Sequence, residues 1–120
     1  MSVLVVDDEE DIGLMISMFL KKEGLKTDFS LRVTPAKDMI IENDYNLYFL
    51  DLNLPDGSGY DLIPLIRDKN KNSGIAVISA YDSNPEIQKA MDLGADIFIK
   101  KPFTKNDIMQ GVETLYRNRS

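Results

Sequence analysis

The chain has 120 residues, the usual size of one domain, and its hydrophobic content of 43% is ordinary for a globular protein. Its net charge of −6 argues against nucleic acid as a direct partner, because phosphate backbones select basic surfaces. The chain has no Cys and no His, which excludes disulfides, thiol chemistry and the commonest zinc ligands.

No apolar run approaches the length of a membrane span, and the amino terminus lacks the pattern of a signal peptide. No repeat, low-complexity tract or linker divides the sequence. We therefore expect a single cytoplasmic domain over residues 1–120, with no contact to a membrane.

Five short runs, most of them apolar and each bounded by polar or turn-forming residues, are predicted to be β-strands. They cover Ser2–Val6, Lys26–Ser30, Leu47–Asp51, Ile75–Ala80 and Ile97–Ile99. The second run has mixed polarity, which is typical of an edge strand. The others are apolar on both faces, as in parallel sheets covered by helices.

Apolar residues recur at helical spacing after each strand and predict five helices. The third is expected from Gly59 to Ile66, with Pro64 inside it and bending it. The fourth, over Pro85–Leu93, is expected to bury Met91, together with Ile87 and Ala90. In the fifth, Thr104 is a plausible N-cap, and Ile108, Val112 and Leu115 are expected to be buried. This alternation of strands and helices predicts an α/β fold with one doubly wound parallel sheet.

Polar side chains lie at the carboxyl ends of four of the five predicted strands. These residues are Asp7 and Asp8, Asp51, Ser79, and Lys101. Because the carboxyl ends of parallel strands share one edge of a sheet, we expect these residues to converge on one cleft.

Each of these residues also has an ordinary structural interpretation. Asp7 and Asp8 could cap the first helix, and Asp51 could open an Asx-turn before the Pro/Gly loop. Ser79 alone carries little information, and a lone Lys101 is more often a solvated surface residue.

Taken together, the three carboxylates should repel one another and raise one another's pKa, and a bound cation would relieve this repulsion. Oxygen ligands suit Mg²⁺, and the lysine and hydroxyl nearby suggest that a phosphoryl group binds beside the metal.

Four motifs together resemble the receiver domain of two-component response regulators. They are Val5-Val6-Asp7-Asp8-Glu9, the loop Asp51-x-Asn53-Leu54-Pro55, Ser79-Ala80, and Lys101-Pro102-Phe103. The resemblance covers the whole chain at the expected spacings. It implies a flavodoxin-like, five-stranded sheet of order 2-1-3-4-5 with five helices.

The resemblance also implies that Asp51 is the phosphoacceptor and that the reaction depends on Mg²⁺. The ion would be bound directly by Asp8, Asp51 and the backbone carbonyl of Asn53, and by Asp7 mainly through a water molecule.

Lys101 would pair with a phosphoryl oxygen, and its bond to Pro102 is usually cis in the family. Ser79 would hydrogen-bond another phosphoryl oxygen and would form a conformational switch with Phe98.

The implied function is a signalling switch that receives its phosphoryl group from a sensor histidine kinase or a phosphotransfer protein. It would not be a conventional enzyme, although it would promote its own phosphorylation and dephosphorylation. The face formed by the fourth helix, fifth strand and fifth helix would bind an output domain or a second copy of the chain.

Two alternatives remain open from the sequence. A Mg²⁺-dependent phosphatase with an Asp nucleophile would favour an acid two residues after Asp51, where this chain has Asn53. A protein-interaction domain that is never phosphorylated would use the acids only to bind a structural ion.

Overall fold

Five β-strands alternate with five α-helices in the computed structural model, which describes residues 1–81 and 83–117. The strands are β1 (Ser2–Val6), β2 (Lys26–Ser30), β3 (Leu47–Asp51), β4 (Gly74–Ser79) and β5 (Ile97–Lys100). The helices are α1 (Glu10–Lys22), α2 (Val33–Glu42), α3 (Leu62–Lys69), α4 (Asn84–Leu93) and α5 (Lys105–Arg117), and a 3₁₀ turn, η1 (Gly59–Asp61), precedes α3.

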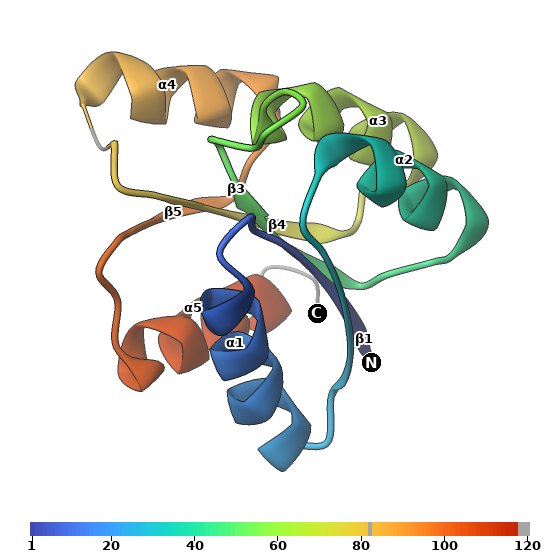
Figure 1. The fold of residues 1–120 in the computed structure, drawn as a ribbon, viewed down its shortest axis with the longest axis vertical. Helices are drawn as coiled ribbons and strands as arrows, with labels where there is room; N and C mark the ends of the chain where they lie inside the picture. Colours follow the sequence, from blue (N-terminus) through green and yellow to red (C-terminus); the bar gives the residue numbers. More distant parts are fainter. Residues whose placement is uncertain (82, 118–120) are drawn as a thin grey trace.

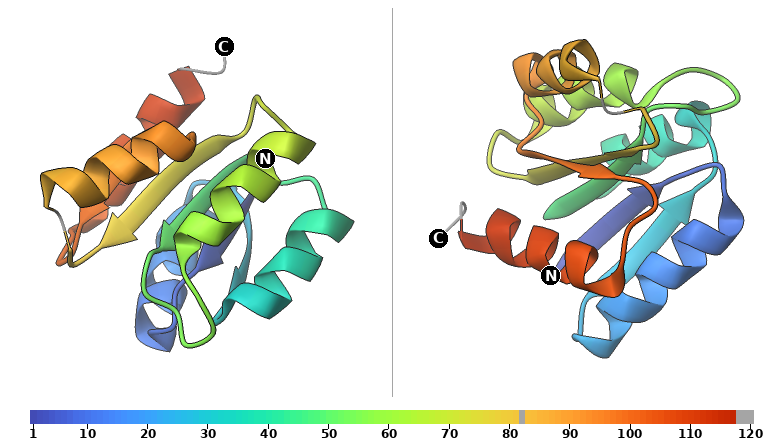
Figure 2. Two further views of the ribbon diagram at one scale, coloured as in Figure 1. Left: turned by 90° about the horizontal axis from the view of Figure 1, so that it is seen from above. Right: turned by 90° about the vertical axis from the view of Figure 1, so that its left-hand side faces the viewer.

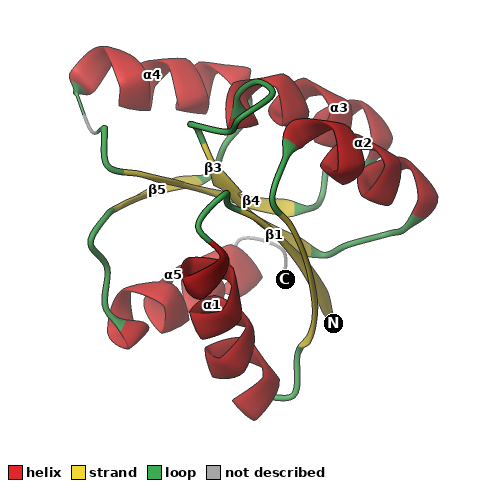
Figure 3. Cartoon of the chain, in the orientation of Figure 1, coloured by secondary structure: helices red, strands yellow, loops and turns green. Residues whose placement is uncertain are grey.

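The strands form one parallel sheet in the order β2-β1-β3-β4-β5 (Figures 1 and 3). This confirms the expected fold class and strand order. The order reverses between β1 and β3, and the helices that follow these two strands lie on opposite faces of the sheet. In sheets of this kind, ligands bind outside the carboxyl ends of the strands at such a reversal.

The sheet lies between two layers of helices. Helices α2, α3 and α4 cover one face, and α1 and α5 cover the other (Figures 1 and 2). Every residue of β3 and β4 is buried, whereas β2, at the edge, is buried only at Ser30. The uniformly apolar runs of β1, β3 and β4 therefore belong to strands covered on both faces, and the mixed-polarity run of β2 is an edge strand, as predicted. The apolar run of β5 forms the other edge and is buried only at Ile99, so the expectation that it is covered on both faces is wrong.

The alternation of side chains along each strand sorts the core into two layers. In β3, Tyr48 and Leu50 pack in the layer with α2, α3 and α4, whereas Leu47 and Phe49 pack in the layer with α1 and α5. Fully burying a side chain the size of Phe49 contributes about 2–3 kcal/mol. Side chains continue to alternate between the two faces just past the strand ends. Each polar residue there therefore points to one particular face of the sheet.

Two expectations about helices are wrong. The third helix was expected to begin at Gly59 and to bend at Pro64, but Gly59–Asp61 form a 3₁₀ turn and α3 begins at Leu62. Pro64 is therefore the third residue of α3, where its missing N–H removes no intrahelical hydrogen bond. In α4, Met91 was expected to be buried but is 39% exposed, because the helix contacts the core mainly through Ala90.

The predicted N-cap of α5, the predicted cis bond and all but one of the burial predictions for α5 are confirmed. Thr104 caps α5, since its Oγ1 accepts a hydrogen bond from Asp107 N at 3.2 Å and Asp107 Oδ2 accepts one from Thr104 N at 2.8 Å. Within α5, Ile108 and Leu115 are fully buried, whereas Val112 is only partly buried. The bond between Lys101 and Pro102 is cis.

Among the described residues, no helix combines the length and the apolar character needed to cross a membrane.

Candidate functional site

Asp7, Asp51 and Lys101 meet at the carboxyl edge of the sheet because all three continue the same face. Along their strands they follow Val5, Phe49 and Ile99, which belong to the core layer with α1 and α5. Backbone bonds extend the ladder to the outer residues: Asp7 N donates to Ser30 O at 3.0 Å, and Lys101 N to Ser79 O at 2.9 Å. The two acids and the lysine therefore point toward a common space.

Lys101 connects the acids. Its Nζ lies 2.9 Å from Asp7 Oδ2, 3.1 Å from Asp51 Oδ2 and 3.3 Å from Glu9 Oε1. The Lys101 side chain is only 11% exposed, and those of Asp7 and Asp51 are 0% and 5% exposed. Ion pairs this shielded from water interact more strongly than surface pairs.

The two buried carboxylates are also held by backbone amides. Asp7 Oδ1 accepts a hydrogen bond from Glu9 N at 2.8 Å, and Asp51 Oδ1 accepts one from Asn53 N at 3.1 Å. Asp7 Oδ2 is buried and has no hydrogen bond of good geometry among the described residues, so its contact there is the ion pair with Lys101. A buried carboxylate oxygen engaged in this way retains the capacity to accept a further positive partner.

The acids are placed to bind a cation. Asp7, Asp8 and Asp51 each offer one carboxylate oxygen, and these oxygens lie within 4.8 Å of one another. Asp8 is exposed, so the cluster opens to solvent on its side. An all-oxygen donor set, in a chain without His or Cys, fits Mg²⁺ better than zinc.

A depression of about 240 Å³ lies over this cluster and provides room for a small anionic group. The residues lining it are Asp8, Glu9, Asp51, Asn53, Ala80, Tyr81 and Lys101.

Burial dominates the protonation behaviour of Asp7. It raises the pKa of Asp7 to about 6, against the opposing effects of the Glu9 amide and Lys101, and the charge of Asp51 adds a smaller increase. The expectation that crowded acids raise one another's pKa is therefore right in direction for Asp7 but wrong about the main cause. Burial opposes the charge of Lys101, but hydrogen bonds and attraction to Asp7 and Asp51 outweigh it and raise the pKa of Lys101 above its ordinary value.

Ser79 and Phe98 share the other face of the sheet. They alternate with residues such as Ile78 and Ile99 that point toward α1 and α5, so they lie on the side of α4. Ser79 is fully buried, and its Oγ accepts a hydrogen bond from Tyr81 N at 3.0 Å. Phe98 is partly buried against the core layer beneath α2, α3 and α4.

Two residues near the site were not assigned a role from the sequence. Glu9 contacts Lys101, but a run of five acids from residue 7 to residue 11 does not reveal which one faces a lysine 92 positions away. Asp56 lies in the Pro/Gly loop after Asp51, and its carboxylate accepts hydrogen bonds from the first amides of α2. The absence of any acid in the first turn of α2 was the signal that could have pointed to Asp56.

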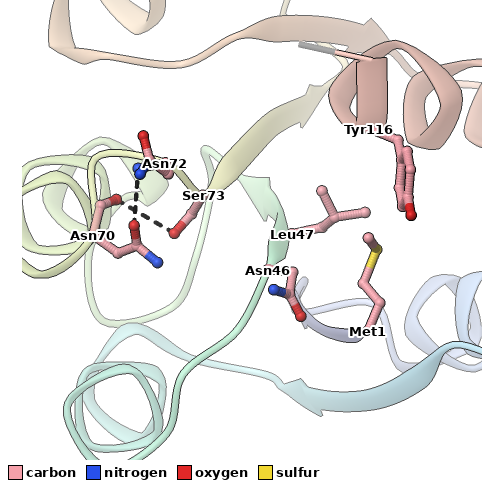
Figure 4. Close-up of a pocket in the computed structure, with 7 residues that line it drawn as sticks. All are labelled: Met1, Asn46, Leu47, Asn70, Asn72, Ser73 and Tyr116. Carbon is pink, nitrogen blue, oxygen red and sulfur yellow. Dashed lines mark hydrogen bonds between the residues drawn. The ribbon is translucent and has the colours of Figure 1, made fainter. Parts of the chain in front are cut away.

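A second cavity, at the opposite end of the strands, has a different character (Figure 4). It is lined by Met1, Asn46, Leu47, Asn70, Asn72, Ser73 and Tyr116. None of these residues has an acidic or basic side chain. The charged residues of the predicted site therefore lie at the carboxyl ends of the strands, and this cavity, at the amino ends, contains none of them.

A sequence comparison supports the resemblance. The family model described as the response regulator receiver domain matches residues 3–113. The transcriptional regulatory protein CusR of Escherichia coli is 31% identical over 117 residues, which are 98% of this chain. These residues make up 52% of CusR, so the chain spans about half the length of that regulator.

Solved structures agree with the sequence comparison. The beryllofluoride-activated NtrC4 receiver domain dimer has a TM-score of 0.92 and 32% identity, with coverage of 99% of this chain and 98% of that one. The response regulator TrrA of Thermotoga maritima, solved in complex with Mg²⁺ and beryllofluoride, has a TM-score of 0.83 and 28% identity, with coverage of 95% and 97%.

Proposed function

The chain belongs to the response regulator receiver domain family of two-component systems, and we propose that Asp51 is the residue that accepts the phosphoryl group. The observation that carries this proposal is the position of the Asp51 carboxylate. It lies between an acid cluster suited to a cation and the ammonium of Lys101, at the mouth of a depression open to solvent.

In the proposed reaction, a carboxylate oxygen of Asp51 attacks the phosphorus of a phosphohistidine on a sensor kinase or phosphotransfer protein. The O–P bond forms as the N–P bond breaks, and the leaving imidazole retains the electron pair of that bond and takes up a proton. The product is an acyl phosphate on Asp51. Water later attacks the same phosphorus, the bond between Asp51 and phosphorus breaks, and inorganic phosphate leaves as the carboxylate is regenerated. The domain thus promotes its own phosphorylation and dephosphorylation as a switch.

The residues of the cluster fit a bound Mg²⁺. Asp8, Asp51 and the backbone carbonyl of Asn53 would hold the ion directly, and Asp7 would act mainly through a water molecule. Mg²⁺ would supply positive charge that offsets the charge of the incoming phosphoryl group. The all-oxygen donor set supports this assignment, as does the buried Oδ2 of Asp7, which has the ion pair with Lys101 but no hydrogen bond among the described residues.

Lys101 would change partners during the reaction. Its ammonium contacts Asp7 and Asp51 in this structure. Once a phosphoryl group stands on Asp51, a phosphoryl oxygen offers Lys101 a stronger anionic partner at nearly the same place. The lysine therefore stabilises the acids before the reaction and the transferred group after it.

Ser79 and Phe98 would transmit the change to the surface. When Ser79 Oγ leaves the Tyr81 amide and turns toward the phosphoryl group, it vacates space on the face of the sheet that it shares with Phe98. Phe98 then rotates inward, which alters the surface over α4, β5 and α5. Exposed polar residues suited to a switchable partner lie on α4 and α5: Gln88, Lys89, Asp92, Lys105, Asn106 and Glu113.

We propose that this surface binds either an output domain or a second copy of the chain, and that the domain works in the cytoplasm. A dimer occurs in the NtrC4 receiver structure, which supports the second possibility.

Intact mass spectrometry after incubation with acetyl phosphate and Mg²⁺ tests the assignment of Asp51. We expect one added phosphoryl group on the wild type, none on Asp51→Ala, and normal labelling of Asp68→Ala, which removes an exposed acid on α3. Phosphate retained by Asp51→Ala would place the acceptor elsewhere. Sustained turnover of p-nitrophenyl phosphate would instead indicate a phosphatase.

A further inference from the structure

Helix α2 has no side chain of its own whose charge would stabilise either end. Its N-cap, Arg32, makes no side-chain capping bond, its first turn has no acid, and its last turn has no base. The first amides of a helix need acceptors, and the last carbonyls need donors. Asn43, the C-cap, donates to the Met39 carbonyl, and the segment that follows β3 supplies acceptors at the amino end and further donors at the carboxyl end.

Asp56 supplies the acceptors at the amino end of α2. Its Oδ1 accepts a hydrogen bond from Val33 N at 2.7 Å, and its Oδ2 accepts one from Thr34 N at 2.9 Å. Each carboxylate oxygen thus binds a different helix amide, and these bonds lower the pKa of Asp56 to about 2. At the other end of α2, Lys69 Nζ donates hydrogen bonds to the carbonyls of Ile40, Ile41 and Asn43.

Asp56 lies near the tip of the loop that begins at Asp51. Leu54 and Gly57 exchange backbone hydrogen bonds of 3.2 and 3.4 Å across the tip. The loop returns to its starting point at Gly59, where a Cβ atom would collide with the carbonyl oxygen of Asp51. The base of the loop is therefore closed by Asp51 and Gly59, and Asp56 fastens the tip to α2.

Gly57 brings the same tip against the helix by packing. Its φ of 154° is one that residues with side chains rarely adopt, and a Cβ built there would lie 3.2 Å from Val33 Cγ2. Val33 is buried in the same core layer as Leu52 and Leu54 of the loop. The hydrogen bonds of Asp56 thus join two surfaces that already pack closely.

We propose that Asp56 is a positioning residue for the metal and phosphoryl site, because its bonds to the Val33 and Thr34 amides hold the loop that carries Asn53. This inference rests on the proposed function, in which the Asn53 carbonyl is a metal ligand. Asn53 N also donates to Asp51 Oδ1, so movement of this peptide disturbs the acceptor carboxylate as well. A loop already fixed in its bound conformation loses less entropy when the ion binds, and binding is correspondingly tighter.

Calorimetric titration with Mg²⁺ alone compares the wild type with Asp56→Ala, Asp56→Asn and Lys69→Met. Both Asp56 variants lose the same charge, but Asn retains one acceptor oxygen, so the difference between them reports the hydrogen bonds. Lys69→Met is the matched control, because it removes the cap from the other end of α2 and leaves the loop intact.

We expect Asp56→Ala to weaken Mg²⁺ binding by about threefold to tenfold, Asp56→Asn to weaken it less, and Lys69→Met to leave it unchanged. Amide hydrogen exchange without metal should be faster at Asn53 and Leu54 in Asp56→Ala than in Lys69→Met. If Asp56→Ala does not fold, the Mg²⁺ affinities of Asp56→Asn and Lys69→Met still test the proposal, which requires weaker binding only in Asp56→Asn.

Wild-type affinity in both Asp56 variants would overturn the proposal. Equal losses in the two Asp56 variants would also overturn it, because charge alone would then be responsible. An equal loss in Lys69→Met would show that the integrity of α2, and not the fastening of the loop, controls binding. A wild type that binds no Mg²⁺ would instead refute the proposed function.

Discussion

The ammonium of Lys101 lies 2.9 Å from the buried Oδ2 of Asp7, and it also contacts Asp51 at 3.1 Å. Lys101 therefore neutralises the same cluster of carboxylates that is suited to a metal ion. A cation entering the cluster competes with the ammonium for Asp7 and Asp51.

Replacing Lys101 with Met should destabilise the metal-free domain and make it more responsive to Mg²⁺. Removing one partner of a buried ion pair leaves an uncompensated charge and costs about 3 kcal/mol or more. Mg²⁺ should restore much of this loss, because it supplies the missing positive charge. Urea unfolding with and without Mg²⁺ measures both effects, and Lys37→Met, which removes an exposed lysine on α2, is the control. Equal stability of Lys101→Met and the wild type without metal would contradict this account.

Mg²⁺ should raise the melting temperature of the wild type. A ligand that binds only the native state contributes roughly 2–3 kcal/mol when its free concentration is about 100 times Kd. Asp8→Ala should abolish most of this rise, and because Asp8 is exposed, the variant should fold normally. Asp11→Ala removes an exposed acid from the first turn of α1, outside the cluster, and should respond like the wild type. If millimolar Mg²⁺ does not change the melting temperature of the wild type, the metal assignment is wrong.

Asp56 should make the domain sensitive to acid. Bonds to the helix amides lower the pKa of Asp56 to about 2, below its ordinary value of 3.8. A lowered pKa means that the unfolded state binds the proton more readily, so this contribution to stability is complete above pH 4 and is lost as the pH falls toward 2. The difference in urea midpoint between the wild type and Asp56→Asn should therefore shrink over this interval. A difference that stays constant from pH 5 to pH 2 would show that the charge of Asp56 contributes nothing.

Beryllofluoride with Mg²⁺ mimics the phosphoryl group and should change amide chemical shifts well beyond the cleft. If Ser79 and Phe98 transmit the signal, the changes should extend over residues 84–116. Ser79→Ala should bind beryllofluoride but confine the changes to the strand ends, because it cannot make the bond that drives the movement. Changes limited to the cleft in the wild type would exclude this route of coupling.

The sequence predicts elements better than it predicts contacts between them. The apolar runs ending at Val6 and Asp51 identify buried strands because covered parallel strands have no polar face. The order of the strands, however, came only from the family resemblance, since local patterns do not specify which strands pair. The start of α3 was misplaced because Gly59 fits the helical spacing although it lies in a 3₁₀ turn.

The site was predicted in composition but not in its internal bonding. From the sequence, Lys101 is predicted to bind a phosphoryl group. In the structure, which has no phosphoryl group, Lys101 forms ion pairs with Asp7 and Asp51. The cap that Asp56 places on α2 joins residues 22 and 23 positions apart, and no local pattern specifies such a contact. Burial is the main cause of the raised pKa of Asp7, and this too could not be predicted, because it depends on how completely the folded chain covers the end of β1.

The sorting of polar residues by strand face has a consequence for how this sequence tolerates insertions and deletions. Asp51 and Lys101 point to one face of the sheet and Ser79 and Phe98 to the other, because each occupies a fixed odd or even position along its strand. Adding or removing one residue within β3 or β5 reverses every later side chain of that strand and exchanges site residues for core residues. Length variation in this domain should therefore concentrate in the connections at the amino ends of the strands, such as residues 70–73, where a changed length leaves the face of each strand intact.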